Sequence, residues 1–195
     1  PMLANPVHMN WDSKGRLWVA CSWSYPQIKP GEIANDKIII LEDSDNDGTA
    51  DKSNVFADGL YLPTGIELAN GGCYVGQSPD VFFLKDTNGD DVADIKELAL
   101  TGFGIEDSHH SISAWRRGPG GWIYFQEGIF LHSQIETQYG VLRNFNGGVY
   151  QYNPRTQEIR LFCRGTGGNP WGHVFDRWGQ SFMVNNPRIM YLSPA

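Results

Sequence analysis

Two acidic loops carry the side chains in this sequence that are best suited to binding a metal ion. Residues 43–52 read DSDNDGTADK, and residues 86–96 read DTNGDDVADIK. Oxygen-bearing residues recur at alternate positions of each loop, so several can turn toward one centre, and Ca²⁺ takes six to eight oxygen ligands. The predicted ligands are Asp43, Asp45, Asp47, the Thr49 carbonyl and Asp51 in the first loop, and Asp86, Asn88, Asp90, the Val92 carbonyl and Asp94 in the second.

A solvated turn rich in Asp, Asn and Gly is the alternative to a calcium site. Two carboxylates roughly 4 Å apart repel by about 4 kcal/mol at an effective dielectric near 20, so crowding them in one loop favours a cation. Position 12 of the first loop is Asn54 instead of the Glu of an EF-hand, and the flanks are not helical. Gly48 suits the sharp turn of the first loop, whereas Asp91 takes its place in the second. We predict calcium-binding β-hairpins that brace the fold, similar to the hairpin loops of integrin-type propellers.

The two loops belong to a repeat, because they begin 43 residues apart, at Asp43 and Asp86. The segments KIIILED and VFFLKD lead into them, and SNVFADGL and KELALTGF follow them. A period of this length, with four strand-like segments per unit, is typical of propeller blades. We expect an all-β fold: one β-propeller domain, or a fragment of one, over residues 1–195, with about three and a half four-stranded blades of a six-bladed propeller. The expected blades cover residues 6–60, 61–103, 108–166 (with an insertion near 131–146) and 170–195, the last incomplete.

The bulk composition excludes several classes of function. The 195 residues carry a formal net charge of −7, so we expect no nucleic-acid partner. No apolar run approaches the ~18 residues of a membrane span and no signal peptide is visible, so we expect no transmembrane segment in this chain. The cysteines Cys21, Cys73 and Cys163 lack CxxC spacing, and the first two are predicted to be buried in strands.

A second candidate site surrounds the adjacent histidines His109 and His110. They precede the first expected strand of the third blade, where propeller loops open onto the central channel. A neutral imidazole can accept a proton near pH 7, so either could be a general base; ordinary loop or packing histidines are the alternative. The seven tryptophans are expected mainly in the core, as at Trp18, whereas Trp115 and Trp171 near the channel are candidates for stacking on a sugar.

Nearly the whole chain resembles the N-terminal propeller of the membrane-bound dehydrogenase-type proteins of planctomycetes and verrucomicrobia. Those proteins often carry a C-terminal haem-binding CxxCH domain. The matching stretches include NPVHMNWDSKGRLWVA, DKIIILEDSDNDGTADK, PTGIE, GFGIEDSHH, GPGGWIY and GNPWGHVFDRWGQ. The family is similar in turn to soluble quinoprotein glucose and sorbosone dehydrogenases. The resemblance therefore implies a propeller that oxidises a sugar or related alcohol with pyrroloquinoline quinone.

The resemblance also implies a catalytic base. In the quinoprotein relatives, a His eight residues before a Gly-Pro-Asp-Gly turn takes the proton of the sugar hydroxyl. Gly118 begins the corresponding GPGG turn here, which selects His110 as the base, with His109 as its neighbour. The turn departs from the pattern because Gly120 stands where the relatives have Asp.

Quinone binding rests on a second motif, which is altered in this chain. The relatives' Arg-Asn-Pro-x-Gly, whose Arg holds the quinone, appears here as GNPWG over residues 168–172. Arg116 or Arg117 could substitute for the missing Arg, or both could be solvated arginines at a strand end. The implied cofactor contacts are Asn169, Arg116, Arg117 and Trp171.

Three functions of different kinds fit these features. The first is a calcium-braced propeller of a quinoprotein-type sugar or alcohol dehydrogenase, with two Ca²⁺ ions and pyrroloquinoline quinone as cofactors. The second is a non-catalytic calcium-binding propeller that recognises a glycan or a protein. The third is a structural module of a larger chain. The resemblance favours the enzyme, whereas the missing Arg and the missing CxxCH motif favour the non-catalytic alternatives.

The partners and the compartment follow from the same features. The substrate of the enzyme would be a small sugar or alcohol. Because the fourth expected blade lacks its outer strand, we expect a fragment whose propeller is closed by its remaining blades or by a second copy. Loops of this kind often bind Ca²⁺ at about 10⁻⁴ to 10⁻³ M, the range of extracellular modules, so we expect a periplasmic or cell-surface protein.

Overall fold

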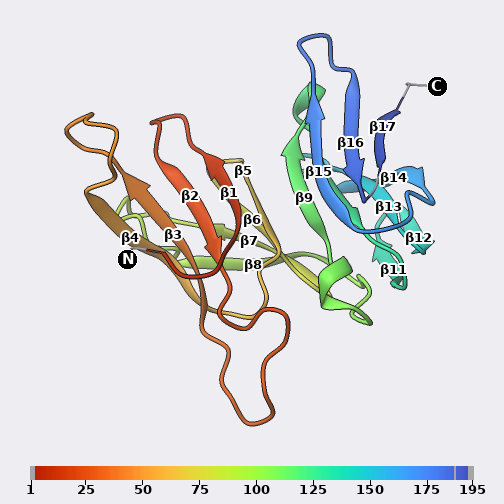
Figure 1. Ribbon diagram of the computed structural model, residues 1–195, viewed down its shortest axis with the longest axis horizontal. Coiled ribbons are helices and arrows are strands. Elements are labelled where there is room, and N and C mark those ends of the chain that lie inside the picture. The colour runs from red at the N-terminus through yellow and green to blue at the C-terminus, as the bar shows by residue number, and fades with distance from the viewer. Residues whose placement is uncertain (1–2, 187, 193–195) are drawn as a thin grey trace. The chain divides into compact units, whose positions relative to one another are not determined.

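The computed structural model describes residues 3–186 and 188–192 and confirms the predicted all-β propeller fold (Figure 1). The chain divides into two compact units. The first comprises residues 1–77 and 81–98, and the second comprises residues 78–80 and 99–195. Among the described residues, no helix has the length and apolar character needed to cross a membrane.

Two antiparallel four-stranded sheets, which meander in chain order, contain the strands of the first unit. The first is β1 (Pro6–Trp11), β2 (Leu17–Cys21), β3 (Asp36–Glu42) and β4 (Lys52–Leu60). The second is β5 (Gly65–Ala69), β6 (Gly72–Gln77), β7 (Asp80–Lys85) and β8 (Ile95–Thr101), whose last two strands reach into the second unit.

The core of the first unit explains why these segments form strands. The β-branched run from Ile38 to Ile40 is buried on both faces of its sheet, which is why it reads as a continuous apolar stretch without alternation. On one face Ile38 and Ile40 pack with Trp18, which meets Phe56 edge-on at 4.5 Å between ring centroids. Cys21 and Cys73 are free and fully buried, as predicted.

The second unit carries one four-stranded sheet in the order β14-β13-β10-β9, one three-stranded sheet in the order β15-β16-β17, and a separate two-stranded hairpin. The single-turn 3₁₀ helices η1 (Ser108–His110) and η2 (Pro119–Gly121) flank β9. The strands are β9 (Ser113–Arg117), β10 (Ile123–Glu127), β11 (His132–Thr137), β12 (Gly140–Phe145), β13 (Gly148–Asn153), β14 (Glu158–Arg164), β15 (Pro170–Phe175), β16 (Ser181–Asn185) and β17 (Arg188–Leu192).

The insertion expected near residues 131–146 is the β11–β12 hairpin, which lies between the second and third strands of its sheet. The hairpin is held at both ends. At its base, the buried Glu127 accepts hydrogen bonds from Ser133 Oγ and Asn144 Nδ2, both at 2.6 Å. At its tip, the Tyr139 hydroxyl donates to the Thr156 carbonyl at 2.8 Å.

Candidate functional site

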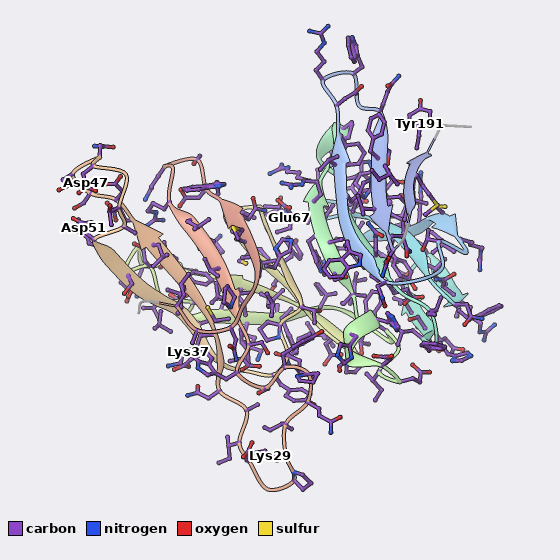
Figure 2. All side chains as sticks on the ribbon, viewed as in Figure 1. Lys29, Lys37, Asp47, Asp51, Glu67 and Tyr191 are labelled. Carbon is purple, nitrogen blue, oxygen red and sulfur yellow. The ribbon has the colours of Figure 1, made fainter. Side chains whose placement is uncertain are left out.

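The first acidic loop joins β3 to β4 and gathers three carboxylates at one end of the sheet (Figure 2). Oxygens of Asp43, Asp45 and Asp47 all lie within 4.8 Å of one another. The backbone N–H groups of Asp47 and Gly48 donate to the carboxylate of Asp43 at 3.1 and 2.8 Å, which holds that side chain inside the loop. Asp47 is fixed in the same way, because the Thr49 N–H donates to it at 2.7 Å.

The second loop joins β7 to β8 and repeats this hydrogen-bond pattern. Asp86 accepts from the N–H groups of Gly89 at 2.7 Å and Asp91 at 2.8 Å, and the Val92 N–H donates to Asp90 at 2.9 Å. Asn88 stands where the first loop has Asp45, and its Nδ2 donates to Asp90 at 3.2 Å. Hydrogen bonds to the charged form, chiefly from the Gly89 N–H, lower the pKa of the exposed Asp86 carboxyl.

The backbone of the two loops is equivalent as well. Each has two residues in the left-handed region: Asn46 (φ 60°) and Gly48 (φ 89°) in the first loop, and Gly89 (φ 86°) and Asp91 (φ 62°) in the second. Gly48 therefore makes the turn predicted for it. Asp91 holds the same conformation at the position where glycine is expected, which Asp tolerates better than most residues.

The carboxylates of the first loop fit Ca²⁺. Two oxygens that bind one Ca²⁺ at 2.3–2.6 Å lie no more than about 5 Å apart, as the Asp43, Asp45 and Asp47 oxygens do. The carboxylates of the predicted ligands Asp51 and Asp94 accept 2.6 Å hydrogen bonds from the hydroxyls of Ser44 and Thr87, and so close each loop.

The candidate base His110 lies in the second unit, at the end of η1 and buried to 5% exposure. Asp107 caps η1 by accepting from the His109 N–H at 2.9 Å, a standard role for Asp before a helical turn. Through this cap, Asp107 Oδ2 comes within 3.1 Å of His110 Nδ1, although the two are not aligned for a hydrogen bond. Sequence reasoning missed Asp107; its signal was an Asp three residues before the histidine.

The charge beside His110 is negative. Burial works to raise the pKa of Asp107, but the hydrogen bond from the His109 N–H and the charge interaction with His110 outweigh it, so the Asp107 pKa is lowered. Asp107 therefore stays ionised, with its carboxylate beside His110 Nδ1. On its other side, Nε2 of His110 meets Oδ1 of Asn169, so each ring nitrogen has an oxygen beside it.

Phe130 covers one side of His110, with ring centroids 5.4 Å apart, and is itself 55% exposed. Its φ of 76° is unusual for a bulky residue and places the ring in this position at the cost of backbone strain. Gly128 completes the packing, because a Cβ there would lie 2.7 Å from the His110 ring. The contacts around His110 thus come from an acidic cap, an amide and an aromatic ring.

The structure brings Asn169 to His110 but not the two arginines. Arg116 and Arg117 lie opposite Tyr124 and Ile123 in the register of β9 against β10. They are beside the GPGG turn, at the opposite end of β9 from His110. Arg116 Nε instead donates to the His173 carbonyl at 3.3 Å.

The two tryptophans proposed for sugar stacking differ in exposure. Trp171 is 70% exposed on β15, next to Asn169. Trp115 is buried to 2%, stacks on Phe125 at 4.3 Å and donates to the Ile112 carbonyl, so its predicted sugar contact is wrong. The large ring fills the core of the second unit instead.

His173 is a buried titratable residue for which sequence reasoning found no role. Its Nε2 lies 2.6 Å from Ser181 Oγ, and aromatic rings of Tyr124 and Phe175 pack against it. Burial, with a smaller contribution from the positive charge of Arg116, lowers the pKa of His173 to about 4. The native state therefore holds this imidazole neutral.

Acidification is expected to destabilise the protein through His173. An unfolded His titrates near pH 6.5 and the folded one near 4, so the unfolded state binds more protons between these values. The contribution of neutral His173 to the free energy of unfolding is complete above about pH 6.5. It is lost as the pH falls toward 4, which lowers the stability by up to about 3 kcal/mol. Denaturant unfolding at pH 7 and pH 4.5 should show a smaller loss in His173→Gln than in wild type. The exposed His132→Gln is the control, and equal losses in all three proteins would contradict the assignment.

Comparison with known families accounts for nearly the entire chain. A model of a domain of unknown function, DUF7133, matches residues 1–193. The chain belongs to the DUF7133 family. No curated protein sequence matches this DUF7133 chain.

Solved structures resemble the DUF7133 chain in fold at low sequence identity. A gluconolactonase from Xanthomonas campestris has a TM-score of 0.62 at 16% identity, over 95% of this chain and 56% of its own. The holo PQQ domain of pyranose dehydrogenase from Coprinopsis cinerea has a TM-score of 0.62 at 12% identity, and the match covers 97% of this chain and 48% of that domain's chain. A nidogen/laminin complex has a TM-score of 0.57 at 12% identity, and the match covers 96% of this chain and 60% of the matched chain. The chain thus spans about half the length of these relatives, and at this identity the likeness shows the fold alone.

Proposed function

We propose that this DUF7133 chain is a calcium-stabilised propeller of an enzyme that oxidises a sugar or related alcohol, with His110 as the general base. The observation that carries the proposal is the buried His110 with an ionised carboxylate, Asp107, 3.1 Å from its Nδ1. Two of the solved relatives, a gluconolactonase and a pyranose dehydrogenase domain, are named for sugar chemistry, which supports this substrate class. The sequence resemblance to the membrane-bound dehydrogenase-type proteins points the same way.

His110 would work through Nδ1. We assign the ring proton of neutral His110 to Nε2, which faces Asn169 Oδ1, so the lone pair would lie on Nδ1. A proton taken from a substrate hydroxyl would form an imidazolium that Asp107 stabilises, which is the arrangement that a general base requires. Because Nδ1 is buried, a substrate reaches it only when a neighbouring side chain moves; the exposed Phe130 packs on the ring and is the neighbour we assign to this movement.

The described residues around His110 do not fit pyrroloquinoline quinone. An anionic quinone needs cationic partners, whereas the charged residue in contact with His110 is the carboxylate of Asp107. Arg116 and Arg117 lie at the far end of β9. We therefore derive no step through the quinone and propose only a two-electron acceptor for the hydride.

The calcium loops and the compartment complete the proposal. Each loop would bind one Ca²⁺ and so stabilise its blade, and loops with affinities near 10⁻⁴ to 10⁻³ M fill only outside the cytosol, so we propose an exported protein. A dye-linked oxidation assay over a panel of sugars and alcohols, with Ca²⁺ and with or without added quinone, tests the enzyme. Turnover of at least one substrate by the purified protein is expected, and a panel without turnover would refute the enzyme.

The non-catalytic alternative has one observation in its favour. Trp171 and Trp178 of the second unit are 70% and 71% exposed, and exposed indole rings suit contacts with a glycan or a protein. The nidogen structure, solved in complex with laminin, has the same fold. Saturable glycan binding without turnover, abolished by Trp171→Ala, would support this alternative.

A further inference from the structure

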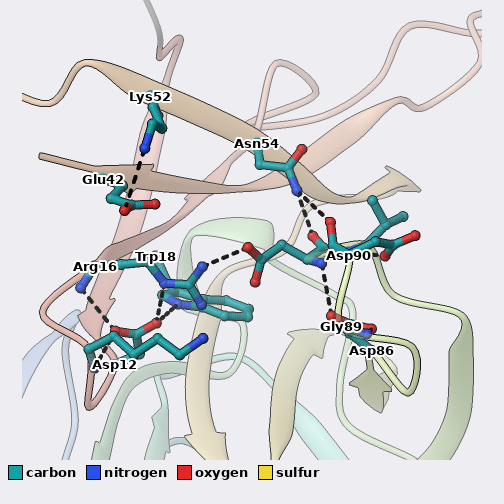
Figure 3. Close-up of polar contacts among 12 residues, drawn as sticks. Asp12, Arg16, Trp18, Glu42, Lys52, Asn54, Asp86, Gly89 and Asp90 are labelled. Atoms are coloured by element: carbon teal, nitrogen blue, oxygen red, sulfur yellow. Dashed lines mark hydrogen bonds and ion pairs between the residues drawn. The ribbon is translucent and has the colours of Figure 1, made fainter. Parts of the chain in front are cut away.

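The second acidic loop is attached to the neighbouring sheet of the first unit by an ion pair (Figure 3). Asp91 Oδ2 accepts from Arg16 Nη1 at 2.7 Å, and Arg16 Nε donates to Asp12 Oδ2 at 2.8 Å. Asp12 is fixed in turn, since Trp18 Nε1 donates to it at 3.0 Å. The side chains of Arg16 and Asp12 are only 11% and 13% exposed.

These contacts favour the charged form of each partner. Burial works to lower the pKa of Arg16, but hydrogen bonds from Arg16 to Asp91 and Asp12 outweigh it and raise that pKa. For Asp12, burial works to raise the pKa, and hydrogen bonds led by the Arg16 N–H lower it. A largely buried, hydrogen-bonded arginine of this kind fixes its partners more firmly than a surface pair does.

The backbone of the second loop is attached to the same sheet through β4. Asn54 Nδ2 donates to the Asp91 carbonyl at 2.9 Å and lies 3.5 Å from the Asp90 carbonyl. Two residues along β4, the Phe56 carbonyl accepts from the Ala93 N–H at 2.8 Å. Asn54 also lies three residues after Asp51 of the first acidic loop, so β4 runs directly from one loop to contacts with the other.

Asp91 links this attachment to the predicted metal ligands. Its N–H donates to Asp86 Oδ2 at 2.8 Å, in a backbone conformation with φ 62° that is uncommon for Asp. Arg16 holds the Asp91 side chain and Asn54 holds its carbonyl, so both stabilise the conformation that orients Asp86. This explains why an Asp stands at the position that Gly48 occupies in the first loop.

We propose that Arg16 and Asn54 are positioning residues that hold the second loop ready for Ca²⁺ and couple its affinity to occupancy of the first loop. The inference rests on the proposed calcium binding. An ion in the first loop fixes the start of β4 and with it Asn54, and by reciprocity an ion in the second loop favours binding in the first. The two sites then bind cooperatively.

Calcium titration calorimetry on the full chain tests the coupling. Asp43→Asn disables the first loop, because both loops have Asp at this first position, and so isolates the second. Asn54→Ala in that background reports how much of the affinity depends on β4. Asn54→Ala and Arg16→Gln in the otherwise unchanged chain should each weaken the second site by about 5- to 20-fold, within the usual range of coupling energies. Ser53→Ala is the matched control, because Ser53 precedes Asn54 on the same strand and is exposed.

The coupling itself appears in a double-mutant cycle. Asp43→Asn should weaken the second site in the wild-type background but have little further effect once Asn54 is alanine. Melting curves in EGTA show whether each variant folds. If Arg16→Gln does not fold, Asn54→Ala alone provides the test of the second site. Two calcium ions bound with affinities unchanged within twofold in both variants would overturn the coupling and leave the calcium sites standing. A wild-type chain that binds no calcium would overturn both.

Discussion

Replacing His110 with alanine is expected to reduce turnover of a sugar or alcohol substrate by about 10²- to 10⁴-fold. The loss corresponds to roughly 3 to 5 kcal/mol of activation free energy. It is expected because His110 combines burial, an ionised carboxylate near Nδ1 and an amide oxygen at Nε2. The measurement is the steady-state rate on the best substrate of the oxidation panel, with the substrate saturating.

Two controls separate chemistry from folding in this experiment. His109 is 57% exposed, so His109→Ala should cost much less turnover than His110→Ala. The calcium-dependent gain in melting temperature should be the same in His110→Ala as in wild type, because both acidic loops belong to the other unit. A His110→Ala protein that oxidises the substrate as fast as wild type would show that His110 is not the base.

Removing calcium is expected to lower the melting temperature by about 10 to 20 °C. When the free calcium concentration is about 100 times the Kd of a site, binding stabilises the native state by about 2.7 kcal/mol. Two such sites contribute about 5 kcal/mol. For a chain of this size, each kcal/mol shifts the melting temperature by about 2 to 4 °C. Calorimetric melting in 10 mM Ca²⁺ and in EGTA gives the difference directly.

Single substitutions assign the calcium effect to the loops. Asp43→Asn should remove about half of the shift, because Asp43 belongs to the three-carboxylate group of the first loop and its position is Asp in both loops. Asp58→Asn is the matched control, since Asp58 is an exposed aspartate on β4 outside either loop. Superimposable melting curves in calcium and in EGTA would refute calcium binding altogether.

The fold was predictable because its signals are local and repeated. The 43-residue spacing of the acidic loops and the apolar run ending in Leu41 are visible in the sequence, and the structure has the corresponding sheets. The hairpin within the insertion was missed, because its β11 strand alternates in burial over a short stretch, with Ser133 and Ile135 buried between exposed neighbours. Such a weak pattern does not stand out in a segment expected to be a loop.

The site was less predictable, because it depends on contacts between residues far apart in the chain. The resemblance selected both His110 and Asn169, which lie 59 residues apart and meet in the structure. Trp115 was misplaced because an aromatic residue in a strand pattern does not reveal which face it occupies. The pairing of Asp91 with Arg16, 75 residues away, has no sequence signal except that Asp replaces the expected glycine.

The β11–β12 hairpin is fastened to its blade at Glu127 and at Thr156, and this determines how it exchanges its amide protons. A loop held at one end opens independently, and its amides exchange through local fluctuations. Here opening requires breaking the buried Glu127 hydrogen bonds at the base and the Tyr139 contact at the tip together. We therefore expect the hairpin amides to exchange together with those of the sheet of β9, β10, β13 and β14, and not through a separate lid-like opening.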